Sequence, residues 1–301
     1  MVNKVITRIC GGLGNQMFTY AVGERLARRY GVPQEYDLIE YFSSKYVFKK
    51  GISTRTFQLR CFKGPRRYCV WPIWRSLALW GVAAVELAIG HELVRRVLEC
   101  LGVHLFRSSN IYFPDPKDIG GDCRAVYSTW LMFSTDLMPP RKALVEEFAL
   151  AEPLAPENAV LRDKMRTCES VSLHVRRTDY LTQPTPWNLS KDYYLRAIDR
   201  VNETAKEPHW FVFSDDLEWS RKEFAFLPNV TFVEGNSVRP WEDLELMKNC
   251  RHHVLANSTF SWWGSYLAND PNGLVVCPRV WPCCSDELPP TFLLPNWVRI
   301  S

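Results

Sequence analysis

The sequence of 301 residues lacks a hydrophobic run long enough to cross a bilayer. About 20 consecutive apolar residues are needed for that, whereas the most apolar segment, 76–85, is bounded by Arg75 and Glu86. We therefore expect this segment in a core or interfacial helix. Because Met1 leads almost directly into an apolar strand at Val5, no secretory signal is expected, and the expected location is the cytoplasm.

A strong charge imbalance is also missing. The formal net charge is +4, and no run of Lys or Arg and no aromatic platform accompanies it, so a nucleic-acid partner is not expected. This mild charge suits an anionic small molecule or loose contact with an acidic membrane surface. Peripheral association with the inner face of a membrane, through a basic helix face in 71–102, remains a second interpretation.

Cysteine motifs with metal-ligand or redox spacing are absent as well. The ten cysteines are scattered and form no Cys-x-x-Cys motif, so buried free thiols in a reducing compartment are expected. The adjacent Cys283 and Cys284 could form a redox or metal site, but no His lies close to them in the sequence. No metal centre is predicted there.

What the sequence does contain is an ordinary globular composition, with 47% hydrophobic and 23% charged residues, over a length that suits two medium domains. Proline-containing sequence at 151–156 predicts a boundary, with domains at 1–152 and 153–301. Strand and helix patterns alternate through the second half without an internal repeat. This predicts an α/β fold with a parallel sheet and helices on both faces.

A glycine-rich turn follows the first predicted strand, 5–10. Residues 11–18 read Gly-Gly-Leu-Gly-Asn-Gln-Met-Phe, and apolar residues at helical spacing come next. The turn matches neither a dinucleotide fingerprint nor a P-loop, and tight packing is the simpler interpretation. The amides of Asn15 and Gln16 favour a ligand site, because a packing turn needs neither.

The most informative stretch is 171–180, which reads Val-Ser-Leu-His-Val-Arg-Arg-Thr-Asp-Tyr. Its alternation predicts a strand over 171–175, with His174, Arg176, Arg177 and Asp179 at or beyond the end where ligands bind in α/β sheets. Adjacent guanidinium groups favour a diphosphate partner. The alternative is an exposed strand end in which Arg177 pairs with Asp179.

Two further predicted strands, 210–213 and 253–256, also end in polar residues. These are Ser214, Asp215 and Asp216 after the first, and Asn257, Ser258, Thr259 and Ser261 after the second. The second set precedes a predicted helix at 265–268, so hydroxyl and N–H groups there can hold phosphate. Together the three strand ends predict a nucleotide site. Asp215 and Asp216 could instead bind a metal, but the two arginines already supply positive charge, so no divalent ion is expected.

With these residues in place, the chain resembles the bacterial-type α-1,2-fucosyltransferases of glycosyltransferase family 11. Five pieces carry the resemblance, in the family's order along the chain: residues 11–18, 174–180, 213–216, 246–250 and 252–264. One departure is Thr178, where the family usually has glycine. A β-branched residue restricts the backbone of that turn.

The resemblance implies a GT-B-like fold, with two Rossmann-like domains facing a central cleft. It implies that 153–301 binds GDP-fucose and that 1–152 contacts the acceptor. The implied reaction is inverting, metal-independent transfer of L-fucose from GDP-β-L-fucose to the 2-hydroxyl of a β-galactoside in an oligosaccharide or surface glycan. Alternatives are another linkage, another GDP-sugar, or a non-catalytic nucleotide-sugar or glycan-binding protein of the same fold.

By motif, the resemblance matches Arg176 and Arg177 to the pyrophosphate, His174 to a position near the guanosine, and Asp243 to an acidic guanine-binding position. Thr259 and Ser261 match hydroxyl positions near the β-phosphate. The catalytic residues we expect are Arg176, Asp179 as the candidate general base, and Asn15. The residues expected to hold the donor are His174, Arg177, Asp215, Asp243, Asn257, Ser258, Thr259, Ser261, Gly14 and Gln16.

Overall fold

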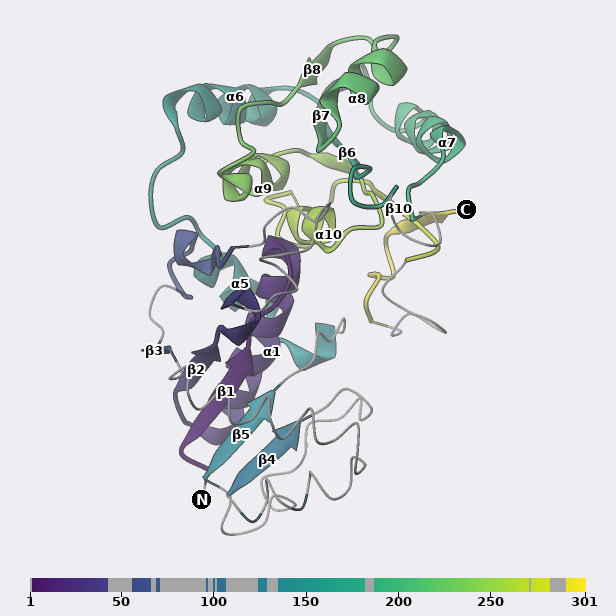
Figure 1. Ribbon diagram of the computed structural model, residues 1–301. Helices are drawn as coiled ribbons and strands as arrows, with labels where there is room; N and C mark the ends of the chain where they lie inside the picture. The colour runs from purple at the N-terminus through teal and green to yellow at the C-terminus, as the bar shows by residue number, and fades with distance from the viewer. Residues whose placement is uncertain are drawn as a thin grey trace. The chain divides into compact units, whose positions relative to one another are not determined.

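The computed structural model describes residues 2–42, 56–65, 69–70, 96, 100, 102–106, 124–128, 135–181, 187–270, 272–281 and 291–301. The chain divides into unit 1, Met1–Ala149, and unit 2, Leu150–Ser301 (Figure 1). This division lies three residues before the predicted boundary. The helices predicted within 71–102, apart from isolated positions, and both Cys283 and Cys284 lie outside the described residues.

Unit 1 contains a five-stranded sheet in the order β3-β2-β1-β5-β4, in which every pair is parallel. Its strands are β1 (Lys4–Arg8), β2 (Gln34–Asp37), β3 (Cys69–Val70), β4 (Val103–Phe106) and β5 (Ala125–Ser128). The helices of unit 1 whose bounds are described are α1 (Leu13–Tyr30) and α5 (Arg141–Glu147), and 3-10 turns lie at Ile39–Phe42, Leu59–Cys61 and Thr135–Leu137. The predicted first strand and the helix after the glycine turn are both present.

Helix α1 lies close against the sheet because of one glycine. A Cβ on Gly23 would stand 2.0 Å from Oγ1 of Thr7 in β1 and 2.2 Å from Nε2 of Gln34 in β2. Only a residue without a side chain fits there. The buried apolar face of α1, which includes Met17, Phe18, Ala21, Val22 and Leu26, therefore packs directly on the strands and places the preceding glycine turn at the end of β1.

Unit 2 contains a six-stranded sheet in the order β11-β10-β9-β6-β7-β8, again with every pair parallel. Its strands are β6 (Ser170–Val175), β7 (His209–Ser214), β8 (Val230–Phe232), β9 (His252–Val254), β10 (Val275–Pro278) and β11 (Val298–Ile300). Its helices are α6 (Pro156–Thr167), α7 (Lys191–Asn202), α8 (Leu217–Phe224), α9 (Pro240–Lys248) and α10 (Thr259–Tyr266). The parallel sheet predicted for this half of the chain is confirmed.

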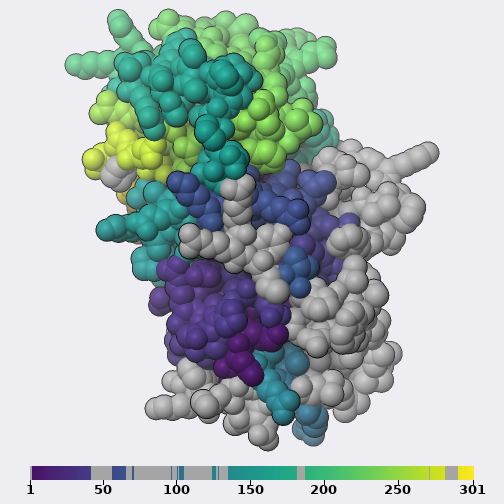
Figure 2. Space-filling model, turned by 90° about the vertical axis from the view of Figure 1, so that its left-hand side faces the viewer, coloured from purple at the N-terminus to yellow at the C-terminus, as the bar shows by residue number. Residues whose placement is uncertain are grey.

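Alternate residues of β7 belong to different cores, which shows that helices cover both faces of the sheet. Trp210 and Val212 pack in one buried cluster with residues of α7 and α8. Phe211 and Phe213 pack in another, with residues of α6 and α9. Helix α6 lies on the surface of unit 2 (Figure 2), and only Asn158 and Met165 are buried within it. Among the described residues, no helix is long and apolar enough to span a membrane.

One predicted helix start is wrong. The helix expected at 265–268 begins instead at Thr259, because Ser258 caps it by accepting a hydrogen bond from the N–H of Phe260 at 3.3 Å. Asn257 and Ser258 thus precede the helix, while Thr259 and Ser261 lie in its first turn. The capping serine was present in the sequence, and the aromatic residues after it obscured the helical pattern.

Candidate nucleotide-sugar site

The sheet order of unit 2 places the three predicted strand ends side by side. Strand β6 pairs with β7 on one edge and with β9 on the other. The chain runs outward from β6 through β7 and β8, then returns to β9 on the opposite side. This reversal forms a topological switch point between β6 and β9, outside whose carboxyl ends ligands bind in such sheets.

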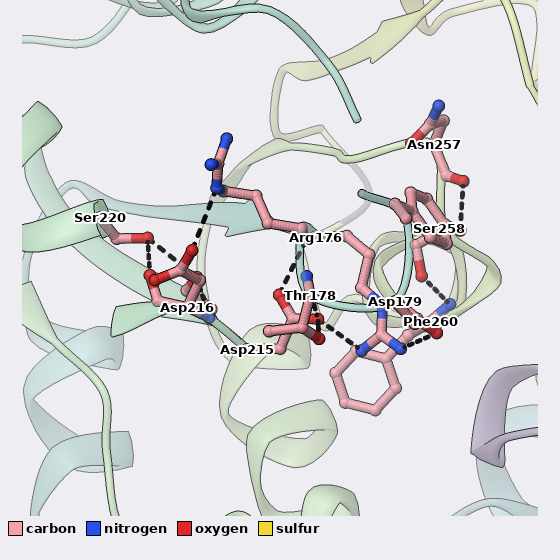
Figure 3. Close-up of polar contacts among 12 residues, drawn as sticks. Arg176, Thr178, Asp179, Asp215, Asp216, Ser220, Asn257, Ser258 and Phe260 are labelled. Carbon is pink, nitrogen blue, oxygen red and sulfur yellow. Dashed lines mark hydrogen bonds and ion pairs between the residues drawn. The ribbon is translucent and has the colours of Figure 1, made fainter. Parts of the chain in front are cut away.

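Arg176, just after β6, is held by two carboxylates. Its Nη2 lies 2.7 Å from Oδ2 of Asp179, and its Nη1 lies 3.2 Å from Oδ2 of Asp215 (Figure 3). Its guanidinium carbon lies 5.8 Å from the ring centre of Tyr180. Burial acts to lower the pKa of Arg176, but Asp215 and Asp179 outweigh burial and the pKa is raised. The guanidinium stays charged, and it has more N–H donors than these two ion pairs use.

Arg177 points to different partners. Its Nε donates to Oδ2 of Asp216 at 3.1 Å, and its guanidinium lies 4.0 Å from the ring centre of Trp219. The alternative in which Arg177 pairs with Asp179 is therefore wrong, since Asp179 pairs with Arg176. Asp216 also caps α8 by accepting from the N–H of Trp219 at 3.1 Å. The two arginines thus face different neighbours rather than forming one open cationic pair.

Three carboxylates surround the two guanidinium groups, on Asp179, Asp215 and Asp216. The expectation that no metal is needed assumed that the two arginines supply positive charge to the diphosphate. In the structure these carboxylates already balance that charge. Among the described residues, no group of three or more His, Cys, Asp or Glu side chains is arranged to hold a metal ion. Metal independence stays a prediction for solution experiments.

Asp215 also holds the backbone of the turn after β6. Its Oδ1 accepts from the N–H of Arg177 at 2.8 Å, and its Oδ2 accepts from the hydroxyl of Thr178 at 2.6 Å. The backbone of Thr178 is not in the left-handed region. Among the described non-glycine residues, the positive φ angles are those of Glu207 and Asn229. The β-branched side chain of Thr178 is thus accommodated without a left-handed backbone conformation.

His174, the fifth residue of β6, is a buried, neutral imidazole. It is 6% exposed, and its buried Nδ1 has no hydrogen-bond partner within the part of the chain that the structure describes. Burial, and after it the charge of Arg176, lowers the pKa of His174 to about 3. Its ring centre lies 5.7 Å from that of Phe260, in the first turn of α10. The residue is thus a buried, uncharged side chain beside the switch point.

The polar residues after β9 differ in what they can offer a ligand. The hydroxyl of Ser261 is buried and lies 3.3 Å from the carbonyl oxygens of Ala256 and Ser258, which share its one O–H donor. The amide of Asn257 donates to the carbonyl of Trp187 at 2.8 Å. Both residues hold the strand end together, whereas Thr259 is only half-buried in the first turn of α10.

Asp243 lies in a separate polar group at the start of α9. Its Oδ1 accepts from Nδ2 of Asn236 at 2.7 Å. Burial raises the pKa of Asp243 to about 6, the hydrogen bond from Asn236 opposes this rise, and the neighbouring Glu242 adds to it. Glu242 is itself buried and accepts from Nδ2 of Asn158 at 2.6 Å. Asp243 thus titrates closer to neutral pH than an ordinary aspartate.

In unit 1 the predicted residues Gly14, Asn15 and Gln16 lie in the first turn of α1, which begins at Leu13 directly after the glycine turn. Gln16 is fully buried, and its Nε2 donates to the carbonyls of Gly11 at 3.1 Å and Thr56 at 2.8 Å, while its Oε1 accepts from the N–H of Gln58 at 2.8 Å. These bonds give Gln16 a structural task. Gly14 is buried, and Asn15 is half-buried with its side chain against Gly11. A ligand role for Asn15 stays a prediction.

Two residues that the sequence motifs do not include also contact the predicted site residues. Trp219 supports the guanidinium of Arg177, and Asn236 donates to Asp243. Trp219 carried a usable signal, because a large aromatic residue follows Asp215 and Asp216 by one helical turn. Asn236 carried none, since its role depends on how the loop before α9 folds back.

Comparison with known proteins identifies relatives over nearly the whole chain. The sequence model described as Glycosyl transferase family 11 matches residues 157–301. An α-1,2-colitosyltransferase of Escherichia coli is 28% identical over 99% of both chains, and the O-antigen biosynthesis glycosyltransferase WbnK of Escherichia coli is 30% identical over 91% of this chain and 93% of its own. Galactoside α-(1,2)-fucosyltransferase 1 of Leontopithecus chrysomelas is 32% identical, over 54% of this chain and 48% of its own.

Among solved structures, the fucosyltransferase NodZ from Bradyrhizobium aligns with a TM-score of 0.54 at 14% identity, over 89% of this chain and 94% of its own. NodZ α-1,6-fucosyltransferase soaked with GDP-fucose aligns equally well, over 89% and 93% of the two chains. This likeness shows the fold, which is α/β and GT-B-like as expected, with a Rossmann-like sheet in each unit.

Proposed function

This chain belongs to glycosyltransferase family 11 and is a glycosyltransferase, and from that premise we propose that it transfers L-fucose from GDP-β-L-fucose to the 2-hydroxyl of a β-galactoside. The relatives named for a linkage, a colitosyltransferase and a galactoside fucosyltransferase, are both α-1,2-transferases. Crystals of NodZ were prepared with GDP-fucose and with GDP. A GDP-linked 6-deoxy sugar is thus the donor class that the comparisons favour.

The observation that carries the proposal is the position of Arg176 and α10 on either side of the switch point. Arg176 follows β6, α10 begins after β9, and these two strands are paired neighbours. A diphosphate placed there meets N–H groups of a guanidinium and the N-terminal end of a helix, both of which favour negative charge. Asp243 is proposed to accept hydrogen bonds from the guanine, and unit 1 to bind the acceptor.

In the proposed reaction, a hydroxyl oxygen of the acceptor forms a bond to the anomeric carbon of fucose from the face opposite GDP. The bond from that carbon to the β-phosphate oxygen breaks, its electron pair leaves with GDP, and the hydroxyl proton passes to a base. Arg176 stabilises the charge that develops on the departing phosphate. The configuration at the anomeric carbon is inverted.

Asp179 is proposed as the base, and its geometry makes that assignment testable. Its Oδ2 is committed to Arg176 at 2.7 Å, and its Oδ1 is buried. A base role requires Oδ1 to reach the acceptor hydroxyl in the substrate complex. Asp179→Asn should then lower kcat by about a hundredfold or more. Turnover close to that of the unaltered enzyme would reduce Asp179 to a holder of Arg176, because Asn can still accept from the guanidinium.

We also propose that the transfer needs no divalent metal, which the resemblance to the family supports. Activity assayed in EDTA should equal activity in added Mg²⁺ or Mn²⁺. Loss of activity in EDTA that either ion restores would contradict this part of the proposal, and Asp215 and Asp216 would then be the first ligands to test.

A second donor deserves a direct comparison, because the colitosyltransferase is similar over 99% of both chains. Colitose differs from fucose by the absence of the 3-hydroxyl. A site that hydrogen-bonds this hydroxyl rejects the deoxy sugar strongly, whereas a site that does not contact it discriminates only weakly. The ratio of kcat/KM for GDP-fucose and GDP-colitose therefore decides between the two donors.

The decisive experiment incubates the protein with each GDP-sugar and a panel of galactose-terminated oligosaccharides, followed by linkage analysis of the products. We expect an α-1,2-fucosylated galactoside. A product of another linkage or another sugar would support the corresponding family alternative. Binding of GDP-fucose or of a galactoside without turnover on any acceptor would favour the non-catalytic interpretation.

A further inference from the structure

The turn after β6 contains two successive backbone N–H groups that the chain fills with its own carboxylate. The N–H of Arg177 donates to Oδ1 of Asp215 at 2.8 Å, and the N–H of Thr178 donates to Oδ2 at 3.2 Å. Successive N–H groups of this kind form a concavity that binds anions. Because Asp215 occupies it, a phosphate cannot use these N–H groups and has to be reached by the side chain of Arg176.

The same carboxylate reaches both the guanidinium of Arg176 and the hydroxyl of Thr178. Nη1 of Arg176 lies 3.2 Å from Oδ2 of Asp215, and the hydroxyl of Thr178 donates to Oδ2 at 2.6 Å. The hydroxyl bond is the shortest of the four contacts on this carboxylate, and its length is typical of a charge-assisted bond. Figure 3 shows Thr178 and Arg176 directed at Asp215.

The sheet register explains why Asp215 can do this. Val175 of β6 pairs with Ser214 of β7, so Asp215 stands beside the first residue of the turn. Asp215 also lies on the β7 side of β6, whereas the switch point lies on the β9 side. Asp215 is therefore better placed to support the turn than to contact a ligand at the switch point.

We propose that Asp215 is a positioning residue and that the Thr178 hydroxyl is the second part of the device, so that together they set the direction of the Arg176 guanidinium toward the donor phosphate. This inference rests on the proposed function. It replaces the expected donor-binding role of Asp215, and it gives Thr178 a task that a glycine in its place could not perform.

Thr178→Val tests the proposal because valine has the same shape but no hydroxyl. Thr178 is exposed, so the variant should fold. We expect kcat to fall about tenfold, equivalent to about 1.4 kcal/mol, while the donor KM changes less than threefold, because the Arg176 interaction matters most as charge develops on the phosphate. Thr178→Ser, which keeps the hydroxyl, should restore kcat to within about threefold.

Thr231→Val is the matched control for the loss of a threonine hydroxyl bond. The hydroxyl of Thr231 in β8 is 2.8 Å from Nε2 of His209, within the same sheet. This variant should lose a comparable hydrogen bond and keep its kinetic constants. An equal loss of kcat in Thr231→Val would show that the kinetic effect reflects general destabilisation of the sheet, and the proposal would fail.

A double-mutant cycle with Arg176→Ala separates positioning from direct contact. The readout is GDP affinity by calorimetry, since the terminal phosphate of GDP resembles the leaving group. Thr178→Val should weaken GDP binding about tenfold when Arg176 is present and less than twofold when it is absent. An equal loss in both backgrounds, or no loss in either, overturns the inference while leaving the proposed function intact. Failure of the unaltered protein to bind GDP overturns the proposed function and, with it, this inference.

Discussion

At the scale of single residues, the charges of the site are arranged mainly to hold one another. Arg176 contacts Asp179 and Asp215, and Arg177 contacts Asp216. A guanidinium fixed by two carboxylates loses less side-chain freedom when a phosphate binds, because its orientation is already set. The ion pairs thus reduce the attraction for an anion and improve the geometry with which the remaining N–H groups meet it.

Arg176→Ala should lower kcat by about a hundredfold to a thousandfold, because it removes the donors proposed to stabilise the departing phosphate. The kcat of Arg176→Lys should lie between those of Arg176→Ala and the unaltered enzyme, since lysine keeps the charge without the planar fork. The measurement is GDP release with a galactoside acceptor. Arg200→Ala, which removes an exposed ion pair to Glu203 on α7, is the control and should be unaffected. A loss of kcat in Arg176→Ala of only a few-fold would contradict the proposed role of Arg176 at the departing phosphate.

The raised pKa of Asp243 predicts a pH dependence of base recognition. Its carboxylate is proposed to accept from guanine N–H groups, and protonation near pH 6 removes that acceptor. Guanosine affinity should be constant above pH 7 and fall about tenfold per pH unit well below 6. Guanosine is the probe because the terminal phosphate of GDP itself titrates near 6. A flat profile from pH 5 to pH 8 would exclude Asp243 from the guanine site.

The carboxyl group of Asp243 affects the stability of the fold in the opposite sense: low pH, which weakens guanosine binding, favours the folded state. Because the folded-state pKa of Asp243 is raised from 3.8 to about 6, its favourable contribution is complete below about pH 4 and is lost as pH rises to 6. Asp243→Asn should therefore raise the free energy of unfolding at pH 7, by up to about 3 kcal/mol. The gain should vanish near pH 4, as measured by denaturant unfolding. Destabilisation at pH 7 would show that the carboxylate is well solvated or paired.

At the scale of secondary structure elements, α10 combines a structural cap with the proposed phosphate site. Ser258 caps the helix through the N–H of Phe260, and no acidic residue lies in the first turn. No acidic side chain of that turn therefore offsets the partial positive charge of this helix end. His174 reaches the same turn through Phe260, so β6 and α10 jointly form the region where the donor phosphates are proposed to lie.

Two substitutions at Ser258 separate the cap from the anion site. Ser258→Ala should lower the free energy of unfolding by about 1 kcal/mol, because the capping acceptor is lost. Ser258→Asp should retain the cap and stability, since aspartate is an equally good N-cap, yet weaken GDP binding tenfold or more through repulsion of phosphate. Denaturant unfolding and calorimetry give the two quantities. GDP affinity unchanged in Ser258→Asp would move the phosphates away from α10.

At the scale of the whole molecule, each unit has its own parallel sheet and its own buried residues. The division at Ala149 and Leu150 separates two sheets that share no strand. The family model covers 157–301, which is most of unit 2. Arg176, Asp243 and the N-terminal end of α10, which we propose to bind the donor nucleotide, lie in that unit, whereas Gly14 and Gln16, which the sequence also assigned to the donor, lie in unit 1. Donor binding and acceptor binding are thus proposed to belong to different folding units.

Residues 150–301 expressed alone should fold and bind GDP. All hydrogen-bonded strand pairs of β6 to β11 lie within this fragment, and its length is typical of an independent domain. Thermal unfolding should show one cooperative transition, and calorimetry should give a GDP affinity within about tenfold of that of the full chain. A fragment without a cooperative transition would show that unit 2 depends on unit 1 for its stability. The same fragment carrying Arg176→Ala is the control for specific binding.

The sequence alone was enough to predict the strands β6, β7 and β9, after which the site residues of unit 2 lie. Residues 171–175 and 210–213 alternate or run as apolar segments, and such patterns depend on local backbone geometry. It did not reveal β2, β3, β4 or β11. Strand β2 reads Gln-Glu-Tyr-Asp, in which no apolar period is visible, and its pairing with β1 follows from α1 returning the chain to the sheet. Strands of this kind form through tertiary contacts rather than local preference.

The sequence by itself therefore determined which polar groups come together, because it specifies the strands and the polar residues that follow each strand. What each group contacts was decided only by the tertiary structure. Arg177 and Asp215 are 38 positions apart, and Gln16 and Thr56 are 40 apart, yet these pairs are bonded because parallel pairing and helix packing bring distant segments together. A motif specifies the chemistry available at a strand end, whereas the partner of each charge depends on distances that exist only after the sheet has formed.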